Sequence, residues 1–197
     1  MDDLLNNLHE ETHWVGSLSW KAHTKANITL INTMISDVEV TAHYDVLVFW
    51  NPEPQRTLRE QALRYHPRIL WDLIEYTLLS IGESPHLLNM MGLNQPYFKT
   101  FYGSYFITKP QHMKKYVRWI SKIIHFLETD RKAQNMLWRD SKYEGDLKVA
   151  RIVYNLPFYP LHAFLGERLL QYFFNTRGAT ILTADEYVIL KQPSVKK

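Results

Sequence analysis

The chain has 197 residues, of which 46% are hydrophobic and 14% aromatic, so it can form one domain with a full core and is too apolar for a disordered chain. No apolar run reaches the roughly 18 residues needed to span a bilayer, and the acidic, polar start MDDLLNNLHEET lacks the pattern of a signal peptide. Zero cysteines exclude a disulfide framework and a thiolate site. We therefore expect a single domain over residues 1–191, a disordered tail over 192–197 and a cytoplasmic location.

The net charge of +3 hides an uneven distribution. Residues 1–45 carry seven acidic residues against two lysines, whereas residues 109–151 carry eleven Lys and Arg against five acids. The simpler interpretation is a solvated helix face whose basic side chains extend over apolar surface. The alternative is a basic rim that attracts a phosphate-bearing ligand or an anionic surface, which includes peripheral contact with a membrane. No recognised nucleic-acid-binding motif accompanies this charge, so we expect no nucleic-acid partner.

The first half of the chain predicts two strands among helices. His13 to Trp20 alternates between the two sides of a strand, and Lys21 to Met34 then leans helical, while 37–41 is too short to assign. Tyr44 to Trp50 is apolar on both faces apart from Asp45, which is typical of a strand in the middle of a layered sheet. Helical spacing of apolar residues follows in three segments, namely Gln55–Tyr65, Arg68–Ile81 with Gly82 as its stop, and a short turn from Ser84.

The second half begins with the clearest pattern in the sequence, a predicted strand that leads into a predicted helix. Phe101 to Ile107 is aromatic and β-branched around the small residues Gly103 and Ser104, and Pro110 opens an amphipathic helix that reaches Thr129. Three segments follow, namely a polar, weakly helical stretch over 130–145, a long helix over Leu161–Phe174 that Gly178 ends, and an edge strand or extended tail over Ala179–Leu190. The expected fold class is α/β, with a mixed sheet of three or four strands flanked by five or six helices.

Five short motifs occur in one order along residues 1–176. They are His13-Trp14-Val15-Gly16 with Ser19-Trp20-Lys21, Tyr44-Asp45-Val46-Leu47-Val48, Ile69-Leu70-Trp71-Asp72-Leu73-Ile74, the strand–helix unit ending at Thr129, and Phe164-Leu165-Gly166-Glu167-Arg168-Leu169-Leu170. In this order the chain resembles the capsular-polysaccharide-type glycosyltransferases, which are nucleotide-sugar-dependent enzymes related to the GT-A fold. The resemblance implies a partial GT-A-like fold and the transfer of a sugar from a nucleotide sugar to a glycan acceptor.

The chain departs from that family in three respects. Lys21 and His23 stand where the family usually has adjacent arginines. The resemblance begins after the βαβ half in which the family holds its nucleotide, so we expect that half to be missing. GT-A enzymes commonly hold Mn²⁺ or Mg²⁺ with an Asp-x-Asp motif, and none occurs here. These departures favour, as an alternative, a non-catalytic domain of the same fold that binds glycan or a partner protein.

Two carboxylates are candidates for the general base that deprotonates the acceptor, Glu167 and Asp45. The alternative for Glu167 is a structural ion pair with Arg168, and for Asp45 a polar residue at the mouth of a strand. Gly166 is expected to allow a close approach to the helix. The predicted substrate-binding residues are Trp20, Lys21, His23, Tyr44, Gly103, Ser104, Tyr105 and Arg168. Most aromatic residues are expected in the core, and the site is expected at the carboxyl edge of the sheet.

A zinc protease motif, H-E-x-x-H, is matched by His9-Glu10-Glu11-Thr12-His13. A zinc-dependent hydrolase is therefore a remote alternative. The position of a third histidine ligand holds Ser19, no sheet precedes the motif, and a strand pattern begins at His13. We expect the motif to be accidental and the protein to contain no zinc.

Overall fold

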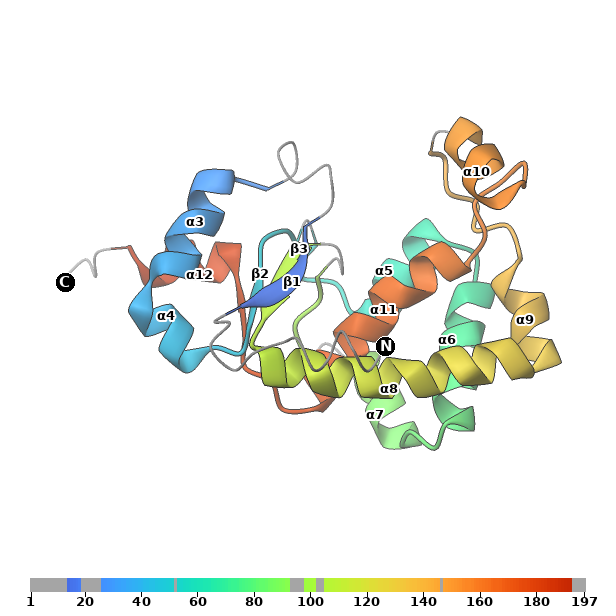
Figure 1. Ribbon diagram of the computed structural model, residues 1–197, viewed down its shortest axis with the longest axis horizontal. Helices are drawn as coiled ribbons and strands as arrows, with labels where there is room; N and C mark the ends of the chain where they lie inside the picture. The colour runs from blue at the N-terminus through green and yellow to red at the C-terminus, as the bar shows by residue number, and fades with distance from the viewer. Residues whose placement is uncertain are drawn as a thin grey trace.

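The computed structural model describes residues 14–18, 26–51, 53–92, 98–101, 105–145 and 147–192. These residues form a four-stranded mixed sheet with helices on both sides, which confirms the expected α/β class (Figure 1). The strands are β1 (Val15–Leu18), β2 (Val46–Val48), β3 (Tyr105–Thr108) and β4 (Ile181–Thr183), and they lie in the order β1-β3-β2-β4. Strand β3 is antiparallel to β1 and to β2, whereas β2 and β4 are parallel.

Strand β2 lies inside the sheet, as its apolar sequence predicts. Val46 and Val48 face one hydrophobic cluster and Leu47 faces the other, and all three side chains are fully buried. A strand covered on both faces is stabilised by apolar residues at every position, because each of these side chains is buried. This is why the alternation that marks β1 is missing from β2.

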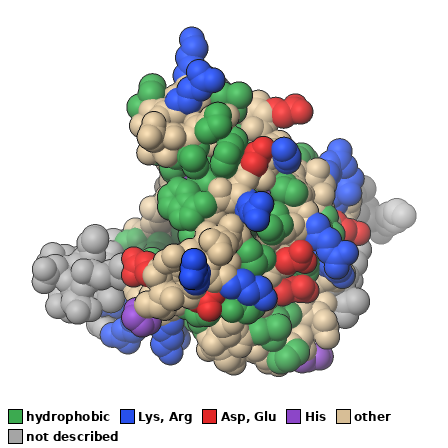
Figure 2. Space-filling model, turned by 90° about the vertical axis from the view of Figure 1, so that its right-hand side faces the viewer, with side chains coloured by type: hydrophobic (Ala, Val, Ile, Leu, Met, Phe, Trp, Pro, Cys, Tyr) green, Lys and Arg blue, Asp and Glu red, His purple; other side chains and the backbone are tan. Residues whose placement is uncertain are grey.

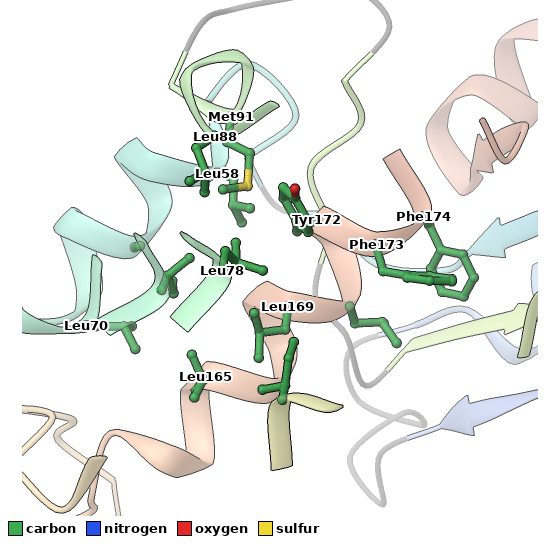
Figure 3. Close-up of a cluster of buried hydrophobic side chains, with 14 of the residues drawn as sticks. Leu58, Leu70, Leu78, Leu88, Met91, Leu165, Leu169, Tyr172, Phe173 and Phe174 are labelled. Carbon is green, nitrogen blue, oxygen red and sulfur yellow. The ribbon is translucent and has the colours of Figure 1, made fainter. Parts of the chain in front are cut away.

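The larger cluster lies on the side of the sheet that carries the helical body. The helices of this body are α5 (Leu58–Tyr65), α6 (Ile69–Ser80), α7 (Pro85–Met91), α8 (Pro110–Thr129), α9 (Arg131–Leu137) and α11 (His162–Thr176). Figure 3 shows Leu165, Leu169 and Tyr172 of α11 packed among side chains of α5, α6 and α7. Full burial of each such side chain stabilises the fold by about 1.5–3 kcal/mol. Because α11 buries side chains against all three of these helices, it is the central helix of this body.

The smaller cluster covers the opposite face of the sheet. Three helices, α3 (Ile28–Ser36), α4 (Val38–His43) and α12 (Ala184–Leu190), enclose Leu47, Tyr105 and Leu182 there. The predicted edge position of the last strand is confirmed by β4, but the extended conformation expected for Ala184–Leu190 is wrong. Thr183 and Glu186 form a capping box, which satisfies the first backbone N–H groups and starts a helix.

Helix boundaries follow the turn and capping residues. Gly82 and Gly178 have φ of 87° and 70°, in the left-handed region that glycine adopts without strain, and they end α6 and α11 as predicted. Helix α5 begins at Leu58, later than predicted, because Thr57 and Glu60 form a capping box. The long helix α8 occupies the predicted span.

A glycine in the edge strand determines how closely β1 approaches its neighbour. A Cβ placed on Gly16 would lie 2.1 Å from the carbonyl oxygen of Phe106, a backbone atom of β3. Only glycine therefore permits the observed pairing at this position. The helix α10 (Leu147–Tyr154) was not predicted. No helix within the described part of the chain is long and apolar enough to cross a membrane.

Candidate functional site

Half of the predicted site can be placed. Trp20, Lys21, His23, Gly103 and Ser104 lie outside the described residues, as does the H-E-x-x-H motif over 9–13. The remaining members occupy three separate places, one in the helical body, one on the opposite face of the sheet and one at an edge of the sheet.

Arg168 and Glu167 lie on α11 within the helical body. The side chain of Arg168 is 1% exposed, and its Nη1 atom lies 3.8 Å from Oε2 of Glu167. A guanidinium this buried cannot reach an external diphosphate in this conformation, so the geometry favours the ion-pair alternative for Glu167. No described part of the chain makes the close approach expected at Gly166, because a Cβ there would meet nothing within 4 Å.

The same part of the helical body holds a buried histidine. His66 follows α5, and its Nδ1 lies 3.2 Å from the carbonyl oxygen of Ser141. Burial lowers the pKa of His66 to about 4, the positive charge of Arg168 contributes to the decrease, and the contact with Ser141 opposes it. His66 is therefore neutral at pH 7, with Nδ1–H as the donor to Ser141.

Tyr105 and Tyr44 belong to the opposite face of the sheet. Tyr105 is buried in the smaller cluster and packs edge-to-face on Trp50, with ring centroids 5.2 Å apart. It is a core residue, in line with the expectation for most aromatics. Tyr44 is partly buried and lines a groove of ≈ 330 Å³ that also has Lys99 and Glu186 in its wall. Tyr44 is thus the predicted binding residue that faces an open groove.

Asp45 lies at the centre of a polar cluster at one edge of the sheet. Its Oδ2 accepts hydrogen bonds from the backbone N–H of Thr180 (3.0 Å) and the Thr180 hydroxyl (2.8 Å). Its Oδ1 lies 3.2 Å from Nζ of Lys109 and 3.4 Å from Nε2 of His112. The hydroxyl of Thr108 donates to the Asp45 carbonyl oxygen (2.8 Å). We call Asp45, Thr108, Lys109, His112 and Thr180 the Asp45 cluster.

The fold brings these residues together from three elements. Asp45 precedes β2 and Thr180 precedes β4, so the two parallel strands begin side by side. Antiparallel β3 ends at the same edge and leads directly through Lys109 into α8, whose first turn carries His112. The cluster therefore lies at the amino ends of β2 and β4, and Asp45 is not at the carboxyl edge where the site was expected. Asp45 lies there because it directly precedes β2, and the antiparallel direction of β3 brings the first turn of α8 to the same edge.

The protonation states follow from these contacts. Burial acts to raise the pKa of Asp45, but the hydrogen bonds from Thr180 and Lys109 outweigh it and leave the pKa below its usual value. Burial lowers the pKa of His112, although Asp45 opposes this. At pH 7 the cluster therefore pairs an ionised carboxylate with a neutral imidazole.

This arrangement changes which residue can act as a base. The Asp45 carboxylate is stabilised in its ionised form by several donors, which makes it a weak base. With a proton on Nε2, which faces Asp45, His112 has Nδ1 as its basic nitrogen. An imidazole oriented by a carboxylate in this way is a general base suited to neutral pH. Sequence reasoning missed His112, although its position two residues after Pro110 placed it in the first turn of a helix beside the end of a strand.

The Asp45 cluster does not fit the Mn²⁺ or Mg²⁺ ion that the resemblance to GT-A enzymes implies. Both oxygens of Asp45 are already engaged, and the Lys109 ammonium beside them would repel a divalent cation. Elsewhere in the described ranges, no three His, Asp or Glu side chains gather in a way that could hold a metal ion.

Comparison with known proteins assigns neither a family nor a function to the chain. No protein-family model, no curated protein and no solved structure matches the chain.

Proposed function

We propose that this protein transfers a sugar from a nucleotide sugar to a glycan acceptor, with His112 as the general base. The observation that carries the proposal is a neutral imidazole held by an ionised Asp45 at the sheet edge. Asp45 belongs to one of the five motifs through which the chain resembles the capsular-polysaccharide-type glycosyltransferases. Asp45 is thus the residue that the resemblance and the geometry have in common.

The proposed reaction is a direct displacement. Nδ1 of His112 takes the proton of an acceptor hydroxyl as its oxygen forms a bond to the anomeric carbon. The bond from that carbon to the nucleoside diphosphate breaks, and the diphosphate leaves with the electron pair. Asp45 stabilises the imidazolium that forms and holds the ring in place, in the same way that a carboxylate supports histidine in acyl transfer. Asp45 is thus a positioning residue.

The donor side of the site stays a prediction. Trp20, Lys21, His23, Gly103 and Ser104 stay substrate-binding predictions from the resemblance and take no part in the step at His112, because Leu18 and Tyr105, the described neighbours, lie at the strand ends opposite Thr108. Glu167 is assigned to the ion pair with Arg168, since its carboxylate lies 3.8 Å from that guanidinium within the helical body. Glu167→Gln should therefore reduce stability and leave turnover per folded molecule unchanged.

A second candidate function is non-catalytic binding of a glycan or a protein partner. The observation in its favour is the engagement of both Asp45 oxygens, which would also arise if the cluster only joined α8 to the sheet. Under this alternative, His112 and Lys109 serve the fold alone.

The two functions are separated by an assay of diphosphate release. The protein is incubated with a panel of UDP-, GDP- and ADP-sugars, with and without oligosaccharide acceptors, and the free nucleoside diphosphate is measured. Acceptor-dependent release supports the transferase. Absence of release with every donor, together with a glycan-induced increase in melting temperature, supports the binding domain and rejects the transferase.

A further inference from the structure

Helix α10 exposes an apolar stripe that nothing described covers. Val149, Ile152 and Val153 are spaced at i, i+3 and i+4, so they share one side of the helix, and they are 45%, 84% and 60% exposed. Only Ala150 of this helix is buried. A surface helix in a globular domain normally turns its apolar stripe toward the core. In α10 that stripe is turned outward.

The helix stands away from the body of the protein. In Figure 1 it lies beyond α9 and α11 at the end of the molecule remote from α12, and in Figure 2 it forms the lobe that rises above the rest of that face. Trp138 and Tyr143 precede α10 in the chain, and their side chains are 50% and 44% exposed. Exposed Trp and Tyr are the side chains that favour the boundary between water and lipid headgroups. We call the described residues from Trp138 to Tyr154 the α10 lobe.

Basic side chains accompany the stripe. Helix α10 carries Lys148 and Arg151, both exposed, and no acidic residue. At 100° per residue, Lys148 lies about 40° from Ile152 around the helix, and Arg151 lies about 60° beyond Lys148. Over residues 131–154 the sequence has six Lys and Arg against three acids. The outer side of α10 is thus apolar with a basic border, which is the pattern of helices that lie in the surface of an anionic membrane.

We propose that the α10 lobe binds the surface of a membrane that contains anionic phospholipids. Ile152 and Val153 enter the headgroup region, Lys148 and Arg151 pair with lipid phosphates and carboxylates, and Trp138 and Tyr143 lie at the boundary with water. The same observations argue against a second copy of the chain. Two α10 lobes face to face would place their basic borders together, and three aliphatic side chains are far fewer than the 20–30 residues a side of a stable interface.

A helix of two turns gives reversible attachment. An exposed basic residue near an anionic surface is worth about fivefold in affinity, and removal of an inserted aliphatic side chain weakens binding further. Attachment should therefore decrease with salt and with the loss of the anionic lipid. The inference concerns attachment alone and holds whether or not the Asp45 cluster is catalytic.

The test is co-sedimentation of the full chain with phosphatidylcholine vesicles, prepared with and without phosphatidylserine. We expect binding only to the phosphatidylserine vesicles, a roughly fivefold loss for Arg151→Gln and a larger loss for Ile152→Ser with Val153→Ser. Ile189→Ser on α12 is the matched control, because Ile189 is also an exposed aliphatic residue and lies in the helix layer on the other side of the sheet. All four substituted positions are exposed, so the variants should fold.

Three results would overturn the proposal. The first is equal binding to both vesicle types. The second is no binding to the phosphatidylserine vesicles at low salt. The third is concentration-dependent self-association, measured by light scattering, that Ile152→Ser abolishes, because this would make a second copy the occupant of the stripe.

Discussion

Glu83 offers the sharpest test of what holds the helical body together. It follows α6, and its partly buried carboxylate accepts hydrogen bonds from Nε1 of Trp119 on α8 (2.8 Å) and from the hydroxyl of Tyr172 on α11 (2.7 Å). Arg177, at the end of α11, forms an ion pair with the same carboxylate. One side chain therefore joins three helices. Burial, together with the hydrogen bond to Glu83, raises the pKa of Tyr172.

Replacement of Glu83 by Gln keeps the shape of the side chain and removes its charge. Trp119 and Arg177 can only donate, while Tyr172 can rotate its hydroxyl to accept from the new amide. The hydrogen bonds with Trp119 and Tyr172 thus change from charged ones, worth about 1.5–3 kcal/mol each, to neutral ones worth about 0.5–1.5 kcal/mol each, while the bond from Arg177 keeps its charged donor. We expect Glu83→Gln to lower the free energy of unfolding by on the order of 2–3 kcal/mol. Glu83→Ala should cost more, since it leaves two buried donors without an acceptor.

The assay is urea-induced unfolding followed by circular dichroism. Glu128→Gln is the control, because Glu128 is an exposed carboxylate on α8 and should change stability by less than about 0.5 kcal/mol. For a chain of this length, the loss at Glu83 corresponds to a decrease of about 4–12 °C in melting temperature. If Glu83→Gln unfolds within about 0.5 kcal/mol of the control, the carboxylate does not hold the three helices together and this reasoning is wrong.

Three further predictions concern other elements. Gly16→Ala should lower the free energy of unfolding by about 2–4 kcal/mol, since its Cβ meets the backbone of Phe106. Gly166→Ala, at an exposed position of α11, should increase the free energy of unfolding by about 0.5–1 kcal/mol, and thermal melts compare the two variants. As pH falls from 6.5 to 4, unfolded His66 gains a proton before the folded form does, so the wild type should lose about 3 kcal/mol more stability than His66→Asn in urea titrations at each pH. Asp45→Asn should weaken the contacts with Thr180 and lower the melting temperature, as measured by scanning calorimetry.

Local patterns in the sequence predicted the elements well where one signal dominated. The apolar stripe after Pro110 gave α8 its whole span, and the two-sided apolar run before Trp50 placed β2 inside the sheet. The secondary structure of the segment after Thr183 was harder to predict, because its β-branched residues favour a strand. The capping box between Thr183 and Glu186 starts a helix there, and the Thr-x-x-Glu pattern that forms it is visible in the sequence.

The candidate site could be predicted only in part, because it depends on strand direction. The sequence marked Asp45 as the one charge in an apolar strand, but nothing local shows that β3 runs antiparallel to β2. That reversal brings Lys109 and His112 to Asp45, across more than 60 residues of chain. Likewise, the sequence placed Glu167 and Arg168 on one helix, yet only the packing of α11 shows that Arg168 is buried.

The role of His112 as the base of a sugar transfer can be tested by one ratio of activities. His112→Gln and His125→Gln make the same change on the same helix, but His112 lies beside Asp45 and His125 is exposed near the far end of α8. Both variants are compared with the wild type by kcat/KM for acceptor-dependent nucleoside diphosphate release. We predict a decrease of roughly 10²–10⁴-fold for His112→Gln and no change for His125→Gln, with both proteins folded. Equal activity of the two folded variants would contradict the account.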